Sequence, residues 1–142
     1  MKAERARLAR LQRLERMRDI ARRTAIVEAG RAEGTLAQLQ GLAERTSRMS
    51  AEYATRSDAG DAASLQQMAR FVAGLDRIVA GTSADAARAR QVADARALDV
   101  AAAERRRAAV AERVGDQTRK IARKGENQPI LASRKGFGTG LE

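Results

Sequence analysis

Residues 65–121 decide the fold, and in blocks of seven they run LQQMARF VAGLDRI VAGTSAD AARARQV ADARALD VAAAERR RAAVAER VGDQTRK I. Most first and fourth places of these blocks hold an apolar or small residue. Places that recur in a heptad lie on one side of an α-helix, so this stripe predicts one long coiled-coil helix. Turn formers occupy 57–61 just before it, and we expect Asp61 or Ser64 to cap the helix.

A second amphipathic stripe precedes the turn formers. Its members recur at three-four spacing in two groups: Leu8, Leu11, Leu14, Met17, Ile20, Thr24 and Val27, then Leu36, Leu39, Leu42, Thr46, Met49 and Tyr53. The two groups differ in register by one residue, and Gly30 and Gly34 lie between them. We therefore expect a second helix whose winding changes near these glycines.

Together the two stripes predict an all-α fold, a long antiparallel two-helix coiled-coil hairpin over residues 1–124. Helix 1 is expected at about 3–55, the turn at about 56–61 and helix 2 at about 62–124. A turn near Ala59 pairs residues whose numbers add up to about 117 or 118, such as Tyr53 with Leu65. Residues 125–142, which contain Pro129 and several glycines, are expected to form a flexible, disordered C-terminal tail. Because the line of contact between two helices, the seam, buries little surface, a dimer of hairpins is also a possible assembly.

The composition argues against an enzyme. The 142 residues include no Cys, no His and only three aromatic residues. Thiolate nucleophiles, the common zinc sites and the neutral-pH general base are thereby removed. The glycine-rich run at 136–140 neither follows a strand nor opens a helix, so it does not predict a phosphate loop. We expect no enzymatic activity, no cofactor, no metal and no small-molecule substrate.

The net charge of +10 is concentrated at the two ends of the chain. Residues 1–24 hold nine bases and three acids, residues 118–142 hold six bases and two acids, and the residues between hold equal numbers. A hairpin gathers both ends into one basic pole, in which helix 2 overhangs helix 1 by roughly nine residues. The bases assigned to this pole are Arg5, Arg7, Arg10, Arg13, Arg119, Lys120, Arg123 and Lys124.

The basic pole has three interpretations. It is either a solvated charged end, a docking end for an acidic protein cavity, or a nucleic-acid site. Nucleic acid is the least favoured partner, because no recognised binding motif occurs and few aromatic residues are available to stack on bases. The chain also lacks a segment of about 20 apolar residues and a signal peptide, so we expect a cytoplasmic protein.

Phe71 and Ile78 widen the apolar stripe near the turn. Each precedes a stripe residue by one position, and they lie one heptad apart. Either they cover the seam between the helices, or they form a partner-binding face with Leu36, Gln38 and Leu42 of the facing helix.

Residues 1–124 resemble the FliJ family in three features. These are a basic first helix with regularly spaced leucines (Arg7-Leu8-Ala-Arg-Leu11-Gln-Arg-Leu14-Glu-Arg), a turn, and a longer heptad helix that contains Glu104-Arg-Arg-Arg107. Members of the family are coiled-coil proteins of the flagellar type III export apparatus, related to injectisome stalk proteins. The resemblance implies three partners: the hexameric export ATPase, the export gate membrane protein and export chaperones. It also implies a cytoplasmic protein associated peripherally with the inner membrane.

By this resemblance, the basic pole enters the ATPase ring. The opposite half presents a gate or chaperone face, formed by Leu36, Gln38, Leu42, Phe71, Leu75 and Ile78. The alternative is a basic coiled-coil adaptor that binds nucleic acid or another acidic assembly.

Overall fold

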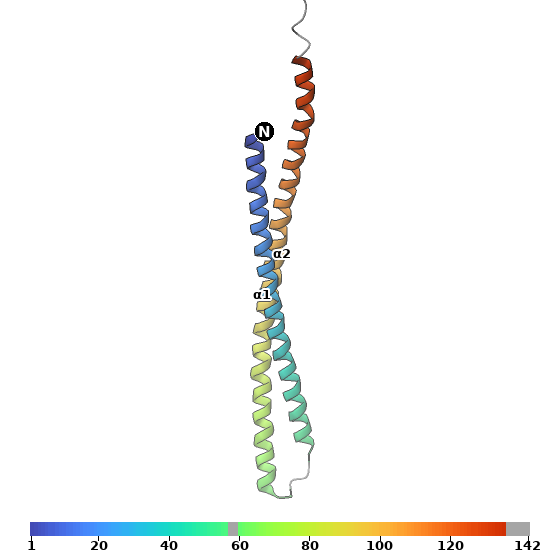
Figure 1. Ribbon diagram of the computed structural model, residues 1–142. Helices are drawn as coiled ribbons and strands as arrows, with labels where there is room; N and C mark the ends of the chain where they lie inside the picture. Colours follow the sequence, from blue (N-terminus) through green and yellow to red (C-terminus); the bar gives the residue numbers. More distant parts are fainter. Residues whose placement is uncertain (57–59, 136–142) are drawn as a thin grey trace, which may run out of the picture. The chain divides into compact units, whose positions relative to one another are not determined.

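The computed structural model describes residues 1–56 and 60–135, and it consists of two long α-helices (Figure 1). Helix α1 spans Lys2–Thr55 and helix α2 spans Ala62–Lys135. The helices pack antiparallel as a hairpin, which confirms the predicted fold class. Two compact units divide the chain: unit 1 comprises Met1–Ala25 and Val100–Glu142, and unit 2 comprises Ile26–Asp99. Each unit pairs a part of α1 with a part of α2.

The start of α2 has the expected cap. The Asp61 carboxylate accepts a hydrogen bond from the Ser64 backbone N–H at 2.7 Å. This bond satisfies one of the amides that the first turn of a helix leaves free. Hydrogen bonding to Ser64 also lowers the pKa of Asp61.

The end of α2 lies farther along the chain than predicted. The helix continues through Pro129 to Lys135, so the expected stop at Glu126–Pro129 is wrong, and residues 125–135 are not a tail. A proline inside a helix costs about 3 kcal/mol, because it removes one backbone hydrogen bond and its ring crowds the carbonyl four residues earlier; the helix nevertheless continues through it. Residues 136–142, with the glycine-rich run, and the turn residues 57–59 lie outside the described part.

Burial along α2 follows the predicted stripe. From Met68 to Ile121 every stripe residue except Arg96 is buried or half-buried. The most enclosed apolar residues on this helix are Leu75, Ala93, Ala103 and Val110. The heptad of α2 is therefore the seam that α1 covers.

Burial along α1 agrees with the predicted stripe only in part. The residues that are buried or half-buried at heptad spacing are Glu4, Leu8, Leu11, Glu15, Arg18, Arg22, Ala25, Ala29, Ala32, Leu36, Leu39, Ala43, Thr46, Ser50 and Tyr53. The residues common to this series and the predicted stripe are Leu8, Leu11, Leu36, Leu39, Thr46 and Tyr53. This series keeps one register throughout. Gly30 and Gly34 are exposed and lie off the seam, so the predicted change of winding is wrong.

The uninterrupted seam leaves apolar side chains of α1 outside. Met17 is 65% exposed and Ile20 is 62% exposed, whereas the charged residues Glu15 and Arg18 occupy the seam beside them. A helix that packs on a partner with one unbroken heptad must keep the same period itself. The register of α2 therefore overrides the local apolar pattern of α1.

The pairing register differs from the prediction by about one heptad. Contacts between the helices include Ser50 with Asp76, Tyr53 with Phe71, Glu28 with Arg96, and Asp19 with Arg107. The numbers in these pairs add up to 124 or 126, compared with the predicted 117 or 118. A heptad stripe is unchanged by a slip of seven residues, so the stripe alone could not decide between the two registers. Leu65, predicted to meet Tyr53, is 53% exposed.

Candidate functional site

Unit 1 contains the whole excess positive charge. Its two segments hold 19 bases and 8 acids, a net charge of +11, whereas unit 2 holds 9 bases and 10 acids, a net charge of −1. All eight predicted pole residues belong to unit 1, and all eight side chains are exposed. One unit of the hairpin is therefore strongly basic, and the other is nearly neutral.

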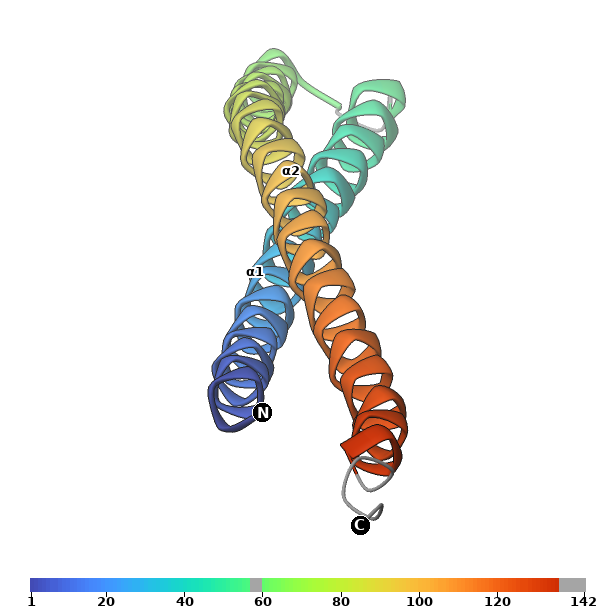
Figure 2. The ribbon, with the colours of Figure 1, turned by 90° about the horizontal axis from the view of Figure 1, so that it is seen from above.

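Within unit 1, the bases of the two helices line a common groove. The first turns of α1 lie beside residues 113–124 of α2 (Figures 1 and 2). The groove has a volume of about 530 Å³ and is lined by Arg7, Leu11, Arg113, Asp116, Gln117, Arg119, Lys120 and Arg123. Five bases and one acid therefore share one open surface.

The groove includes four of the eight predicted pole residues: Arg7, Arg119, Lys120 and Arg123. Arg5, Arg10 and Arg13 are exposed but do not line it. The prediction omitted Arg113, which lies one heptad before Lys120 and therefore on the same side of α2. That spacing was the signal that could have identified it.

Helix 2 does overhang helix 1, but the residues assigned to the overhang are wrong, because the true register places residues 117–124 alongside α1. The Gln117 amide donates to the Glu4 carboxylate at 2.6 Å and to the Glu4 carbonyl at 3.2 Å. The Lys124 ammonium donates to the other Glu4 carboxylate oxygen at 2.7 Å. The bases at 119–124 consequently face the α1 bases, and α2 extends beyond Lys124 by about 16 Å.

Glu4 is the acidic residue that ties the two helices together in the pole. Its hydrogen bonds from Lys124 and Gln117 lower its pKa from 4.5 to about 2. The Glu4 carboxylate therefore stays ionised at pH values well above 2. It holds Gln117, which is 4% exposed, in place beside the groove.

A second acidic residue, Asp19, organises the charged part of the seam. Its carboxylate lies 3.0 Å from Arg22, 2.7 Å from Arg23 and 3.3 Å from Arg107 of α2. The hydrogen bond from Arg22, followed by the charges of the neighbouring arginines, lowers the pKa of Asp19. One carboxylate thus contacts three cations and offsets part of their charge where the seam lacks apolar side chains.

The predicted gate or chaperone face is only partly on the surface. Leu36 and Leu75 are buried in the seam at 6% and 8% exposure, so neither can meet a partner while the helices stay paired. Gln38, Leu42, Phe71 and Ile78 are exposed.

We define the apolar face of unit 2 as Leu42, Met49, Phe71 and Ile78, which are 42–52% exposed. Each of them precedes a seam residue by one position, and in an antiparallel pair such positions lie on the same side of both helices. The opposite side carries a more polar groove lined by Ala43, Glu44, Ser47, Arg48, Val79 and Ser83. The Tyr53 and Phe71 rings meet edge to face, with centroids 4.9 Å apart.

No group of three or more metal-ligating His, Cys, Asp or Glu side chains occurs in the part of the chain that the structure describes. Neither α1 nor α2, over their described residues, has a stretch long and apolar enough to cross a bilayer. Comparison with protein-family models, curated proteins and solved structures finds no match to this chain. The basic groove and the apolar face are the two surfaces from which function is inferred.

Proposed function

We propose that the chain is a non-enzymatic, stalk-like coiled-coil component of a flagellar type III export apparatus. In this proposal the basic groove of unit 1 binds the hexameric export ATPase. The exposed residues of unit 2 bind the export gate membrane protein or export chaperones. The protein acts in the cytoplasm and is held at the inner membrane only through these partners.

The observation that carries the proposal is the separation of charge between the two units. A net +11 on unit 1 favours a partner surface of opposite sign, and this attraction accelerates association over distances near the Debye length. Arginine is the residue best suited to such a site, because its guanidinium stays charged and pairs with carboxylates through two parallel hydrogen bonds. Four of the five groove bases are arginines.

Charge reversal in the groove tests this function. We expect the triple variant Arg7→Glu, Arg119→Glu, Lys120→Glu to stimulate the ATP hydrolysis of the cognate export ATPase at least about tenfold less well than wild type. Three exposed ion pairs are worth roughly 0.5–1 kcal/mol each, and about 1.4 kcal/mol corresponds to a factor of ten.

The matched control reverses three exposed bases of unit 2, Arg45, Arg70 and Arg77. It changes the net charge by the same amount but leaves the groove intact, so we expect near-normal stimulation. Circular dichroism on both variants checks that the helices persist. Equal stimulation by wild type and the groove variant would contradict the proposed docking site.

Nucleic acid is the second candidate partner, favoured by the five groove bases, one on α1 and four on α2. A duplex that contacted all five would bind with a slope of about −4.5 in a plot of log affinity against log salt. Duplex binding with that slope, together with no binding to an export ATPase, would replace the export function with the adaptor function.

A further inference from the structure

The apolar face of unit 2 has more large side chains than a two-helix hairpin can cover. Two seam positions per heptad suffice for a pair of helices, whereas a third apolar position per heptad is typical of helices in a larger bundle. Over two successive heptads of each helix this third position is apolar: it holds Leu42 and Met49 on α1, and Phe71 and Ile78 on α2. The pattern therefore calls for further helices on this side of unit 2.

Two glycines beside the apolar face point to the same conclusion independently. Gly74 and Gly81 each follow Phe71 or Ile78 by three positions, so they lie next to these side chains on the surface of α2. A Cβ added at either glycine would meet nothing within 4 Å. Each glycine costs the helix about 1 kcal/mol relative to alanine, and nothing inside the chain uses the space it leaves. Such space lets the backbone of an external helix approach closely.

The face is complementary to itself. Phe71 and Ile78 are seven residues apart, and so are Gly74 and Gly81. When two α2 helices lie antiparallel with Phe71 of one copy beside Gly81 of the other, Ile78 necessarily lies beside Gly74. The two-fold axis repeats both contacts, as a closed isologous interface requires.

Charge and area also fit a second copy. Unit 2 carries a net charge of only −1, and the four side chains of the apolar face are uncharged, so two such faces meet with little repulsion. With Phe71 beside Gly81, the two α2 helices overlap over residues 62–90, about 43 Å, and the two α1 helices overlap over about residues 43–55, about 20 Å; each helix is roughly 10 Å wide. Face-to-face contact over these lengths would bury up to about 1,300 Å² in total, which is within the range of stable protein interfaces.

We propose that the apolar face of unit 2 binds a second copy of this chain, with the two α2 helices antiparallel, to form a four-helix bundle. This goes beyond the proposed function and does not depend on the basic groove. The same face includes Leu42, Phe71 and Ile78, three of the four exposed residues assigned to a gate or chaperone, so a second copy and such a partner would exclude each other.

Sedimentation equilibrium of the full chain tests the proposal. We expect a mass of twice 15.3 kDa at about 100 µM chain, with little dependence on salt because the unit 2 surfaces that meet carry almost no net charge. The double variant Phe71→Glu, Ile78→Glu is expected to be a monomer. Its matched control, Ala73→Glu with Ala80→Glu, adds the same charges to the opposite side of α2 and is expected to dimerise normally.

A glycine variant distinguishes a loss of the dimer interface from a loss of helix stability. Gly74→Leu with Gly81→Leu places better helix formers in open space, so we expect unchanged or higher helical content by circular dichroism but at least tenfold weaker dimerisation. A 15.3 kDa mass for wild type at all salt concentrations would overturn the proposal. The proposal would also be overturned if the Phe71→Glu, Ile78→Glu variant or the glycine variant dimerised as strongly as wild type.

The orientation can be tested directly, because the chain contains no cysteine. In the antiparallel arrangement, residue 67 of one copy lies level with residue 85 of the other. A mixture of Gln67→Cys chains and Asp85→Cys chains is expected to form the mixed disulfide in preference to either homodisulfide. The Gln67→Cys sites on two copies are separated by about 27 Å along the bundle. Preferential pairing of residue 67 with residue 67 would overturn the antiparallel arrangement.

Discussion

Arg18 offers the sharpest test of how unit 1 is held together. It occupies a seam position of α1 in the strip where charged residues displace apolar ones, and its side chain is half-buried. Among the described residues, its Nε atom is buried and has no hydrogen-bond partner. The substitution Arg18→Leu removes this unsatisfied donor and places an apolar side chain against α2.

The expected gain in the free energy of unfolding is about 1–3 kcal/mol. A buried polar atom without a partner costs about 1–3 kcal/mol, and a half-buried leucine contributes roughly 1 kcal/mol. Against this stands the packing of the arginine stem, which leucine replaces only in part. The substitution also removes one positive charge from a unit with a net charge of +11.

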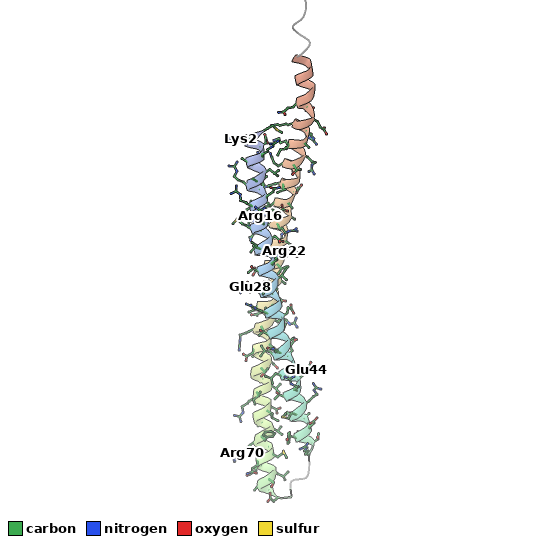
Figure 3. The ribbon with its side chains drawn as sticks, viewed as in Figure 1. Lys2, Arg16, Arg22, Glu28, Glu44 and Arg70 are labelled. Atoms are coloured by element: carbon green, nitrogen blue, oxygen red, sulfur yellow. The ribbon has the colours of Figure 1, made fainter. Side chains whose placement is uncertain are left out.

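Thermal and urea unfolding followed by circular dichroism measure this gain. For a chain of this size, 1 kcal/mol corresponds to roughly 3 °C in the midpoint, so Arg18→Leu is expected to unfold about 3–9 °C higher than wild type. The control is Arg16→Leu, which removes the same charge from an exposed position of α1 (Figure 3). That control is expected to stay within about 0.5 kcal/mol of wild type. A lower midpoint for Arg18→Leu, or equal effects of both substitutions, would refute the reasoning.

Three further predictions concern other parts of the hairpin. Because the pKa of Glu4 falls from 4.5 to about 2 on folding, its stabilising contribution is present above pH 4.5 and is lost as the pH falls toward 2. The difference in thermal midpoint between wild type and Glu4→Gln should therefore shrink over that pH range. A difference that does not change with pH would contradict this. Asp61→Ala should destabilise α2 by about 1 kcal/mol in urea unfolding, with Asp61→Asn close to wild type, since asparagine also caps helices. Leu75→Ala should cost about 2–3 kcal/mol and Leu65→Ala less than about 0.5 kcal/mol, because only Leu75 is buried in the seam; similar losses would restore the register that pairs Leu65 with Tyr53.

The candidate site was predictable to the extent that it depends on charge. Counting bases along the chain located the basic pole, and all eight predicted residues are exposed in unit 1. Which of them share a groove was not predictable, because the answer changes with a slip of one heptad. In the predicted register the four bases at 119–124 project beyond α1, whereas in the structure Lys124 and Gln117 bind Glu4.

The seam of α1 shows where local pattern fails. Met17 and Ile20 continue the three-four spacing of Leu8 and Leu11, and so were expected inside. Once a helix is paired over many turns, however, its seam must follow the period of its partner and not the nearest apolar side chain. The face of unit 2 was misjudged for the same reason, since Leu36 is a seam residue and Leu42 is not.

The sequence by itself determined that this protein is all-α, that turn formers separate two long helices, that Asp61 or Ser64 caps the second, and that the excess charge lies at the chain ends. These features are local or follow from counting, because helix periodicity, capping and charge need no knowledge of the partner helix. Only the tertiary structure decided the register, the true seam of α1 and the membership of the basic groove. The physical reason is that a heptad repeat is degenerate to slips of seven residues, and packing along the full seam resolves that degeneracy.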